Sequence, residues 1–525
     1  MQIGSLMSCE YGGRHPRPVR PRGGSTTPDD AAFRSGPALL LVIAAAAVVL
    51  TGLQPEPVRI GPLRFDRVTA AAALLVAGLG LVVLRYAARH LRGVAGRRAF
   101  LGWTVATVTS AWTLAVADHL GLLVAAWIGV GLASEQLLRA TAGPRSEAWI
   151  VARWKAAADR IADVSLIAAA GLAWWLLGVE DLTGLVEQVA ASGSIRGATV
   201  IVGLIAIAAI VRSAQVPWHG WLPGTVASPT PASALLHAGV VNGGGLLLVR
   251  IAGAVAVVPE VWIILSLAGC CSIAVAAPAA WCQARRKSGL AWSTVSQMGF
   301  MLVQCGLCLG PAAMLHMVGH GIYKAWNFLG AGELPTTAAG PPPAPGRGLL
   351  LLGSGTLAAV PAAAFGLDAF GLASSPGPGK LAMLAVVAIA VGQSWVAILG
   401  TPAPTRSLRP ARIATATLAA ITMPLLACGL FAAARWWWSP AGAAAGPDLS
   451  GPTAVAAWLV AVPPVLLIAG LAVLHLHVAR PDAGPLIRRL RVHAAGGFYL
   501  GIRIGRLLDV GQASLRRLFN GWTHA

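Results

Sequence analysis

The chain has 525 residues, of which 56% are hydrophobic and only 11% are charged, and its mean hydropathy is +0.71. This composition excludes an ordinary soluble domain and predicts an integral membrane protein. The net charge of +20 at pH 7 is typical of basic loops beside anionic lipid. Because the sequence contains no nucleic-acid-binding motif, we expect a lipid bilayer and no nucleic acid as its surroundings.

Apolar runs long enough to cross a bilayer as helices recur along most of the chain. They are apolar on every side, which favours helices over the alternating strands of a membrane barrel. We therefore expect an all-α polytopic membrane protein with about fourteen transmembrane helices, some of them broken. The predicted spans are 36–53, 68–84, 100–117, 119–138, 161–177, 197–211, 232–255, 261–281, 289–310, 312–332, 348–366, 381–400, 411–434 and 453–477.

Two basic tails flank the predicted membrane domain, which covers residues 36–478. Residues 1–35 mix arginine with proline and glycine, and we expect a disordered tail there or the product of a misplaced start. Residues 479–525 mix arginine with leucine, isoleucine and phenylalanine, which predicts amphipathic helices on the cytoplasmic membrane surface or a docking site for a partner.

Basic residues follow alternate spans, as the positive-inside rule requires of loops on one side. The residues that we assign to this side are Arg85, Arg89, Arg92, Arg97, Arg98, Arg139, Arg145, Arg153, Lys155, Arg285, Arg286, Lys287, Arg406, Arg409 and Arg412. The opposite side receives Glu180, Asp181 and Glu187. We therefore predict a cell inner membrane protein with both termini in the cytoplasm.

The segment HMVGHGIYKAW places three titratable side chains in one predicted span. His316, His320 and Lys324 are four residues apart, so at a rise of about 1.5 Å per residue they form one stripe with roughly 6 Å between neighbours. Histidine titrates near neutral pH and a desolvated lysine can do so too, so the stripe predicts proton transfer along the membrane plane. The alternative is that these side chains only hydrogen-bond neighbouring helices.

Lysine is rare in this chain, since only four of the 39 basic residues are lysines, and two of these are Lys287 and Lys324. Arginine is effectively never deprotonated, so a lysine is required where a proton must leave. The choice of lysine at these positions therefore favours proton transfer.

The segment RSAQVPWHGWLPGTVASPTPASALLHAG, residues 212–239, contains four prolines that prevent one continuous helix. Irregular backbone at membrane depth is tolerated only where it is buried in protein or lines a hydrated cavity. His237 follows this break, and we expect it to face a hydrated pocket and to relay or gate protons between Arg212 and Lys287. A structural role for His237 is the alternative.

Cys305, Cys308, His316 and His320 have the order of a zinc-finger ligand set. A turn at LGP separates the two cysteines, which lie in one predicted span, from the two histidines. We therefore expect neither a metal nor a cofactor in this chain. With no phosphate loop and no nucleophile and base pair in the sequence, we also expect a transporter subunit and not an enzyme.

Three segments in combination, RSAQVPWHGWLPGTVASPTPASALLHAG, LAWSTVSQMGFM and HGIYKAWNFLGAGE, resemble the proton-conducting antiporter-like subunits of complex I and the Mrp antiporters. The resemblance covers roughly residues 60–335. It implies a complex I antiporter-subunit-like fold with broken helices and a central line of charged residues that moves protons.

Within that superfamily, LLHAGVVNGGGLLLVR, QMGFMLVQCGLCLG and RVHAAGGFYLG resemble the DabB membrane subunits of the DAB inorganic carbon transporters. This resemblance implies a hetero-oligomer with a cytoplasmic DabA-like subunit that resembles a carbonic anhydrase and carries zinc. Flow of H⁺ or Na⁺ through the chain would then energise conversion of carbon dioxide to bicarbonate in the partner.

The family's functional residues match positions of this sequence one by one. The resemblance implies an ion pathway through Arg212, His237, Lys287, His316, His320 and Lys324, a supporting ion pair of Arg160 and Asp163, and an aspartate at the start of the first shared helix, Asp66.

The sequence departs from the complex I pattern at two places. Ile128 follows Trp127 where those subunits have a glutamate, and Glu135, two turns later on the same helix face, is the expected substitute. The span 381–400 has only Gln393 and Ser394 where a second half-channel needs a charge. Both departures weigh against the two alternative functions, a subunit of a complex I or hydrogenase-linked pump and a cation/proton antiporter subunit.

Overall fold

The structure is a computed structural model that describes residues 28–506 except 55, 145, 193–195, 332–342, 373–376, 402–405, 439–451 and 481. Its first part contains α1 (Pro28–Leu53), β1 (Val58–Ile60), β2 (Leu63–Phe65), α2 (Arg67–His90), α3 (Arg97–Val116), α4 (Leu120–Arg139), α5 (Glu147–Leu177), α6 (Leu182–Ser192) and α7 (Arg196–Arg212). The two strands form an antiparallel hairpin in which Val58 pairs with Phe65.

After α7 the chain breaks into short pieces, as the four prolines predicted. They are the 3-10 turns Trp218–Gly220 and Thr225–Ala227, α8 (Trp221–Gly224), α9 (Thr230–Leu235), the π-helical turn Leu236–Val240, α10 (Asn242–Arg250) and α11 (Ala252–Ala256). The remaining helices are α12 (Pro259–Trp281), α13 (Arg286–Gly306), α14 (Gly310–Ala331), α15 (Pro345–Ala369), α16 (Pro378–Leu399), α17 (Arg409–Trp438), α18 (Pro452–Val478) and α19 (Pro485–Ala495), with 3-10 turns at Arg406–Leu408 and Gly497–Tyr499.

The prediction of an all-α membrane protein is confirmed. Eleven of the described helices are long and apolar enough to cross a membrane, and Gly197–Arg212 is a shorter apolar helix. The predicted spans 289–310 and 312–332 correspond to α13 and α14, which are not among the eleven because they carry many polar side chains. The total of fourteen spans therefore stays a prediction.

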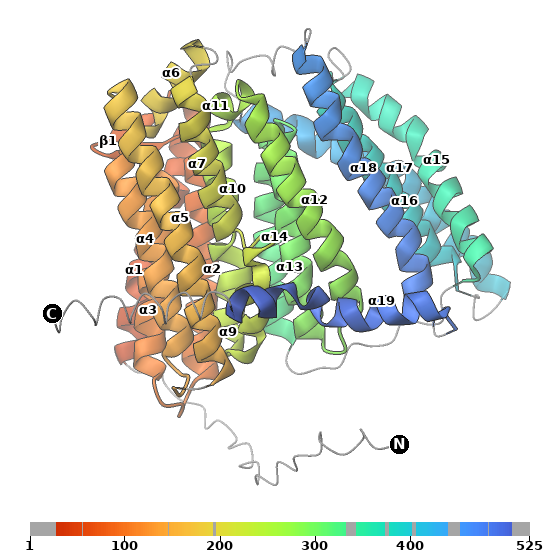
Figure 1. Ribbon diagram of the computed structural model, residues 1–525, viewed down its shortest axis with the longest axis horizontal. Coiled ribbons are helices and arrows are strands. Elements are labelled where there is room, and N and C mark those ends of the chain that lie inside the picture. The colour runs from red at the N-terminus through yellow and green to blue at the C-terminus, as the bar shows by residue number, and fades with distance from the viewer. Residues whose placement is uncertain are drawn as a thin grey trace.

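The helices form two bundles that stand side by side (Figure 1). Helices α1 to α14 make up the first bundle, and α15 to α18, which occupy the right of the view, make up the second. The bundles meet where α12 contacts α18 and where α14 contacts α17. The largest hydrophobic cluster contains Trp127 and Met298 of the first bundle and reaches Val460 of α18, whereas Val391 of α16 belongs to a smaller cluster within the second bundle.

A C-terminal strap, Pro485–Arg506, crosses the end of the molecule at which α18 finishes, and its helix α19 lies across the other helices (Figure 1). Close contacts fix its course: a Cβ atom on Gly501 would come within 2.8 Å of the Cα atom of Gly220, and one on Gly497 within 2.2 Å of the Trp292 ring. The strap thus ties α18 to the first bundle. Of the predicted tails, residues 1–27 and 507–525 lie outside the described part, and residues 28–35 are already helical in α1.

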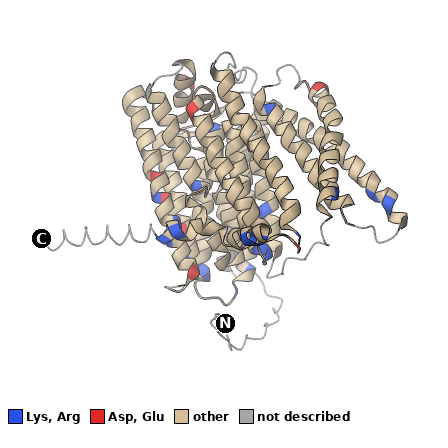
Figure 2. Ribbon diagram, turned by 45° about the vertical axis from the view of Figure 1, so that its right-hand side comes forward, with Lys and Arg blue, Asp and Glu red and all other residues tan. Residues whose placement is uncertain are grey.

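Lysine and arginine gather at the end of the bundles where the strap lies (Figure 2). The loops after α2, α4, α12 and α16 open at this end. One part of the prediction is wrong, however, since Lys155 is not in a loop. Ser146 caps the start of α5 through its side chain, and the helix runs on from Glu147, so Lys155 lies two turns inside it and is 0% exposed.

Candidate functional site

A buried charge cluster joins α5 to α7. We use the name charge cluster for buried Lys155, Asp159, Asp163 and Arg212, together with Arg160, whose side chain is about half exposed. Lys155 Nζ lies 2.5 Å from Asp159 Oδ2, and Arg212 Nη2 donates to Asp163 Oδ1 over 3.0 Å. Arg212 Nε lies 3.6 Å from Asp159 Oδ1, and Arg160 Nη2 lies 2.9 Å from Asp163 Oδ2. The predicted pair of Arg160 and Asp163 is therefore part of a larger network that the sequence analysis did not assemble.

Helix α4 forms the other wall of this cluster. The Arg212 guanidinium lies 4.4 Å from the centre of the Trp127 ring, and its Nη2 also donates to the Trp127 carbonyl oxygen over 3.1 Å. Gly131 makes room, because a Cβ atom there would come within 3.1 Å of Arg212 Nη1. The carboxylates that balance Arg212 therefore come from α5 and not from position 128 of α4, which is an isoleucine.

Glu135 is the residue that we expected to replace an acid at position 128. It is 8% exposed and forms an ion pair with Arg139, one turn along α4, over 2.6 Å. It is near enough to Lys155 to interact with it electrostatically, but its direct contact is with Arg139. Glu135 therefore borders the charge cluster.

His237 lies in the π-helical turn directly after the break and is completely buried. Thr225 donates its hydroxyl proton to the Leu222 carbonyl over 2.7 Å, so at 3.0 Å its oxygen accepts a hydrogen bond from His237 Nε2. The ring stacks on Phe328, with 4.4 Å between the ring centres. Among the described residues His237 Nδ1 has no hydrogen-bond partner, so this nitrogen is able to accept a proton.

His320 connects α14 to this turn. Its Nε2 atom lies 3.0 Å from the His237 carbonyl oxygen, and because a carbonyl only accepts, Nε2 donates. Its Nδ1 atom lies 2.9 Å from the Gln297 side-chain amide on α13. The amide oxygen suits a charged, doubly protonated ring, whereas the amide nitrogen, after a half turn, suits a neutral ring. Gln297 can thus support His320 in either protonation state.

The stripe predicted on α14 is present. The ring centres of His316 and His320 are 6.0 Å apart, and His316 Nδ1 lies 2.9 Å from the Gln304 amide. Lys324 is 0% exposed and donates to the Leu290 carbonyl over 3.0 Å and to Ser293 Oγ over 2.5 Å. The stripe, His237 and Lys287 together form what we name the central line.

Lys287 contacts backbone carbonyl oxygens of the broken segment between α7 and α10. At the start of α13 its Nζ atom donates to the carbonyl oxygens of Val226 and Ser228, over 3.0 and 2.9 Å. These carbonyls are available because the prolines interrupt the helix that would otherwise use them. The same segment holds Thr225 against His237, so the break contacts two members of the central line.

The structure therefore places the predicted site residues in two groups. His237, Lys287, His316, His320 and Lys324 lie on adjoining helices, whereas Arg212, Arg160 and Asp163 lie with Lys155 and Asp159. The two groups meet at one short stretch: the Trp221 ring lies 5.4 Å from Lys155 Nζ, and Thr225 follows four residues later. Asp66 caps α2 by accepting from the backbone N–H groups of Val68 and Thr69 and belongs to neither group.

The sequence analysis missed Lys155, Asp159, Gln297 and Gln304. A signal for the first two was present, because Lys155 and Asp159 stand four residues apart in the alanine-rich segment WKAAAD, a spacing typical of a helical ion pair. No group of three or more histidine, cysteine or acidic side chains that could hold a metal ion occurs in the described part of the chain.

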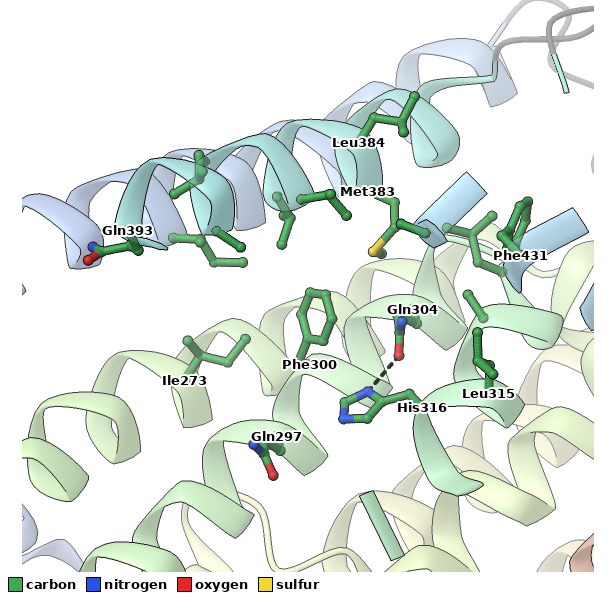
Figure 3. A pocket seen from close by; sticks show the side chains of 18 of the residues that line it. Ile273, Gln297, Phe300, Gln304, Leu315, His316, Met383, Leu384, Gln393 and Phe431 are labelled. Atoms are coloured by element: carbon green, nitrogen blue, oxygen red, sulfur yellow. Dashed lines mark hydrogen bonds between the residues drawn. The ribbon is translucent and has the colours of Figure 1, made fainter. Parts of the chain in front are cut away.

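An apolar cavity of about 850 Å³ separates α13 and α14 from the second bundle. Figure 3 shows His316 and its partner Gln304 on one wall, with Met383 and Gln393 on the facing helix. His316 and Gln297 are among its few polar lining residues. His316 is therefore the member of the central line that lines this cavity.

The model of the family described as NADH:quinone oxidoreductase/Mrp antiporter, TM, matches residues 117–339, which contain both the charge cluster and the central line. The resemblance predicted from the sequence is confirmed. The antiporter-like match thus covers α4 to α14 and ends before the second bundle.

Among curated relatives, the chain is 36% identical over 262 residues to the probable inorganic carbon transporter subunit DabB of Hydrogenovibrio crunogenus, covering 49% of this chain and 50% of that protein. It is 32% identical over 277 residues to NADH-quinone oxidoreductase subunit L of Escherichia coli, covering 51% of this chain and 44% of that protein. The chain spans about half the length of the curated relatives it matches.

A solved structure extends the likeness to most of the chain. In the Mrp complex from Dietzia sp., one chain superposes with a TM-score of 0.52 at 24% sequence identity, covering 94% of this chain and 57% of that one. This likeness concerns the fold alone, and it includes the second bundle.

Proposed function

We propose that this chain is an ion-conducting membrane subunit that energises inorganic carbon accumulation by a cytoplasmic, zinc-containing partner similar to carbonic anhydrase. H⁺ or Na⁺ flow through the chain would drive conversion of carbon dioxide to bicarbonate in that partner. The strap end, where basic loops gather, would face the cytoplasm of the cell and receive the partner.

One observation carries the proposal: buried and half-buried titratable groups lie near one another inside the first bundle. His320 lies between the His237 carbonyl and His316, and Lys324 lies one turn further along α14. Ionisable groups inside a membrane protein are costly and mark ion pathways, and these groups lie within hydrogen-bonding distance of hydroxyl, amide and carbonyl groups. The printed name of the DabB relative supports carbon transport as the process that this flow would drive.

The second candidate is an antiporter-like subunit of a complex I or Mrp assembly, which the relative from Escherichia coli favours. Two features weigh against it. Ile128 leaves α4 without the acid of those subunits, and the middle of α16 carries Gln393 and Ser394 without a charge.

The experiment that separates the candidates is purification of the native complex in mild detergent, with mass spectrometry of the bound chains and a zinc assay. We expect one large soluble partner that carries zinc. A set of membrane subunits with iron–sulfur proteins would contradict the carbon transport proposal and support the second candidate. Uptake of H⁺ or Na⁺ by proteoliposomes that contain the purified complex then identifies the ion, and no uptake of either would contradict an ion-conducting role.

A further inference from the structure

We infer that Lys155 is the proton-loading residue of the charge cluster, the group that takes up and releases the transported proton on the Arg212 side of the central line. This inference rests on the proposed function with H⁺ as the ion. It adds a residue that lies outside the pathway predicted from the sequence, and it assigns Arg212 a supporting role.

Chemistry alone separates the members of the cluster. The cluster contains three cations, Lys155, Arg160 and Arg212, and two carboxylates. Arginine keeps its proton under all physiological conditions, whereas a buried lysine can release one. Lys155 is therefore the one cation of this cluster whose charge can change during transport.

The ion pairs that remain allow that change. Arg160 is about half exposed, so the buried charges of the cluster are Lys155, Arg212, Asp159 and Asp163, which balance while Lys155 is charged. Release of one proton leaves one excess negative charge among the buried groups, and Arg160, 2.9 Å from Asp163, partly offsets it. Arg212 lies 3.6 Å from Asp159 and 3.0 Å from Asp163, so it continues to balance both carboxylates after Lys155 becomes neutral.

The contacts of Lys155 suit both of its states. Nζ meets Asp159 Oδ2 at 2.5 Å and the Gly131 carbonyl oxygen at 3.4 Å, and a neutral amine still has hydrogens for both acceptors. The charged groups that act on it are Asp159 on α5, Arg212 on α7 and Glu135 on α4, and the Trp221 ring covers it from α8.

The transfer step is a simple exchange with water. On release, one N–H bond of the ammonium breaks, its electron pair stays on nitrogen, and the proton passes to a water molecule. On loading, the amine lone pair binds a proton delivered by hydronium. The Trp221 ring covers Lys155 and Thr225 contacts His237, so the proton is released to water on the side of the cluster that borders the central line.

The test is proton flux into proteoliposomes that contain the purified complex, driven by an imposed membrane potential and followed with a pH-sensitive dye. Lys155→Arg keeps a cation beside Asp159 but removes the ability to lose a proton. We expect the flux to fall by about 100-fold or more, with assembly unchanged. Lys380→Arg, the same exchange in the second bundle, is the matched control and should conduct like the wild type.

Lys324→Met in the same assay separates the two proposals. If Lys324→Met blocks flux but Lys155→Arg conducts like the wild type, the inference about Lys155 is wrong and the proposed function stands. A wild-type protein without proton flux overturns both.

If Lys155→Arg does not assemble, the paired variant Lys155→Gln with Asp159→Asn replaces it, since this pair removes the ion pair as a neutral unit. Loss of flux from the assembled double variant supports the inference, and wild-type flux overturns it. If the ion pair of Lys155 and Asp159 were only structural, either assembled variant would conduct protons like the wild type.

Discussion

The two bundles treat polar side chains in different ways. In the first bundle, Lys155, Arg212 and Lys324 are buried between helices and contact groups on neighbouring helices. In the second bundle, Ser394 donates to a carbonyl one turn earlier on its own helix, and Gln393 donates to the Ala472 carbonyl. The second bundle thus follows the general rule for membrane helices, in which polar groups are satisfied by nearby backbone.

Helix packing shows the same contrast. In the second bundle small residues bring α15 and α16 together: a Cβ atom on Gly392 would come within 2.4 Å of the Leu352 carbonyl oxygen, and one on Gly355 within 2.7 Å of Trp395. In the first bundle Gly131 makes room for the Arg212 side chain instead of for a neighbouring helix. Glycines such as Gly306, where a Cβ atom would come within 2.8 Å of the Trp262 carbonyl oxygen, also bring helices of the first bundle together, so the difference is that Gly131 makes room for a buried charge. The comparison shows that the buried ion pairs of the described residues are concentrated in the first bundle.

The strongest test of this comparison exchanges one lysine in each bundle. Lys324→Met should reduce ion flux by about 100-fold or more, because it removes a group that exchanges protons within the central line. Lys380→Met, at the start of α16, should leave flux within about twofold of the wild type. Flux in proteoliposomes measures both, with the amount of assembled complex as the control. Equal losses in the two variants would show that the second bundle also carries the ion.

The second comparison concerns the stability of variants at one arginine in each bundle. Arg212→Leu leaves Asp159 and Asp163 buried without their common partner, which should cost about 3 to 5 kcal/mol of stability. Arg412 in the second bundle donates to the Thr401 carbonyl and hydroxyl oxygens, so Arg412→Leu should cost about 1 kcal/mol. Thermal unfolding of the purified variants compares the two. A similar loss at both positions would mean that the buried carboxylates do not depend on Arg212.

A third comparison uses one glutamine from each bundle. Gln297→Leu removes the amide that supports His320 in both protonation states, so we expect flux to fall roughly tenfold, the value of one to two hydrogen bonds. Gln393→Leu removes a hydrogen bond to the Ala472 carbonyl only, and flux should stay near that of the wild type. Normal flux in Gln297→Leu would mean that His320 does not need this amide.

The last comparison concerns the pH dependence of stability where the first bundle contacts the strap. Burial lowers the pKa of His219 from 6.5 to about 4. His219 therefore binds a proton near pH 6.5 in the unfolded chain but only near pH 4 in the folded protein. The stabilisation is complete above pH 6.5 and decreases as the pH falls, by about 3 kcal/mol at most.

Thermal unfolding between pH 7 and pH 4.5 measures this fall. His219→Asn should reduce it, whereas His493→Asn, at an exposed histidine within the strap, should not. An unchanged fall in His219→Asn would assign the pH dependence to other groups.

Much of the fold could be predicted from the sequence, because apolar runs in a membrane have few alternatives to helices. The predicted span 453–477 agrees with α18 within one residue at each end. The break before His237 was also predictable, since proline acts locally on its own backbone. The spacing of His316 and His320 needed only helical geometry, and the observed 6.0 Å agrees with it.

The remainder depended on packing between distant segments. Lys155 resembles a loop cation because it follows a basic stretch, and only the approach of α4 and α7 shows that α5 buries it. For the same reason, the sequence did not show that α5 supplies the carboxylates that contact Arg212. Local spacing predicts which side chains share a helix face, but it does not predict which neighbouring helix that face meets.

The π-helical turn at His237 has a consequence for how this protein is studied. The hydrogen bond that His320 makes there goes to a carbonyl oxygen of the main chain, which every amino acid possesses. No substitution at position 237 deletes that acceptor. Alanine at position 237 would therefore remove the imidazole but keep the hydrogen bond from His320 to the carbonyl oxygen, and the effect of that hydrogen bond would not be measured. Replacing the peptide bond after residue 237 with an ester would test it.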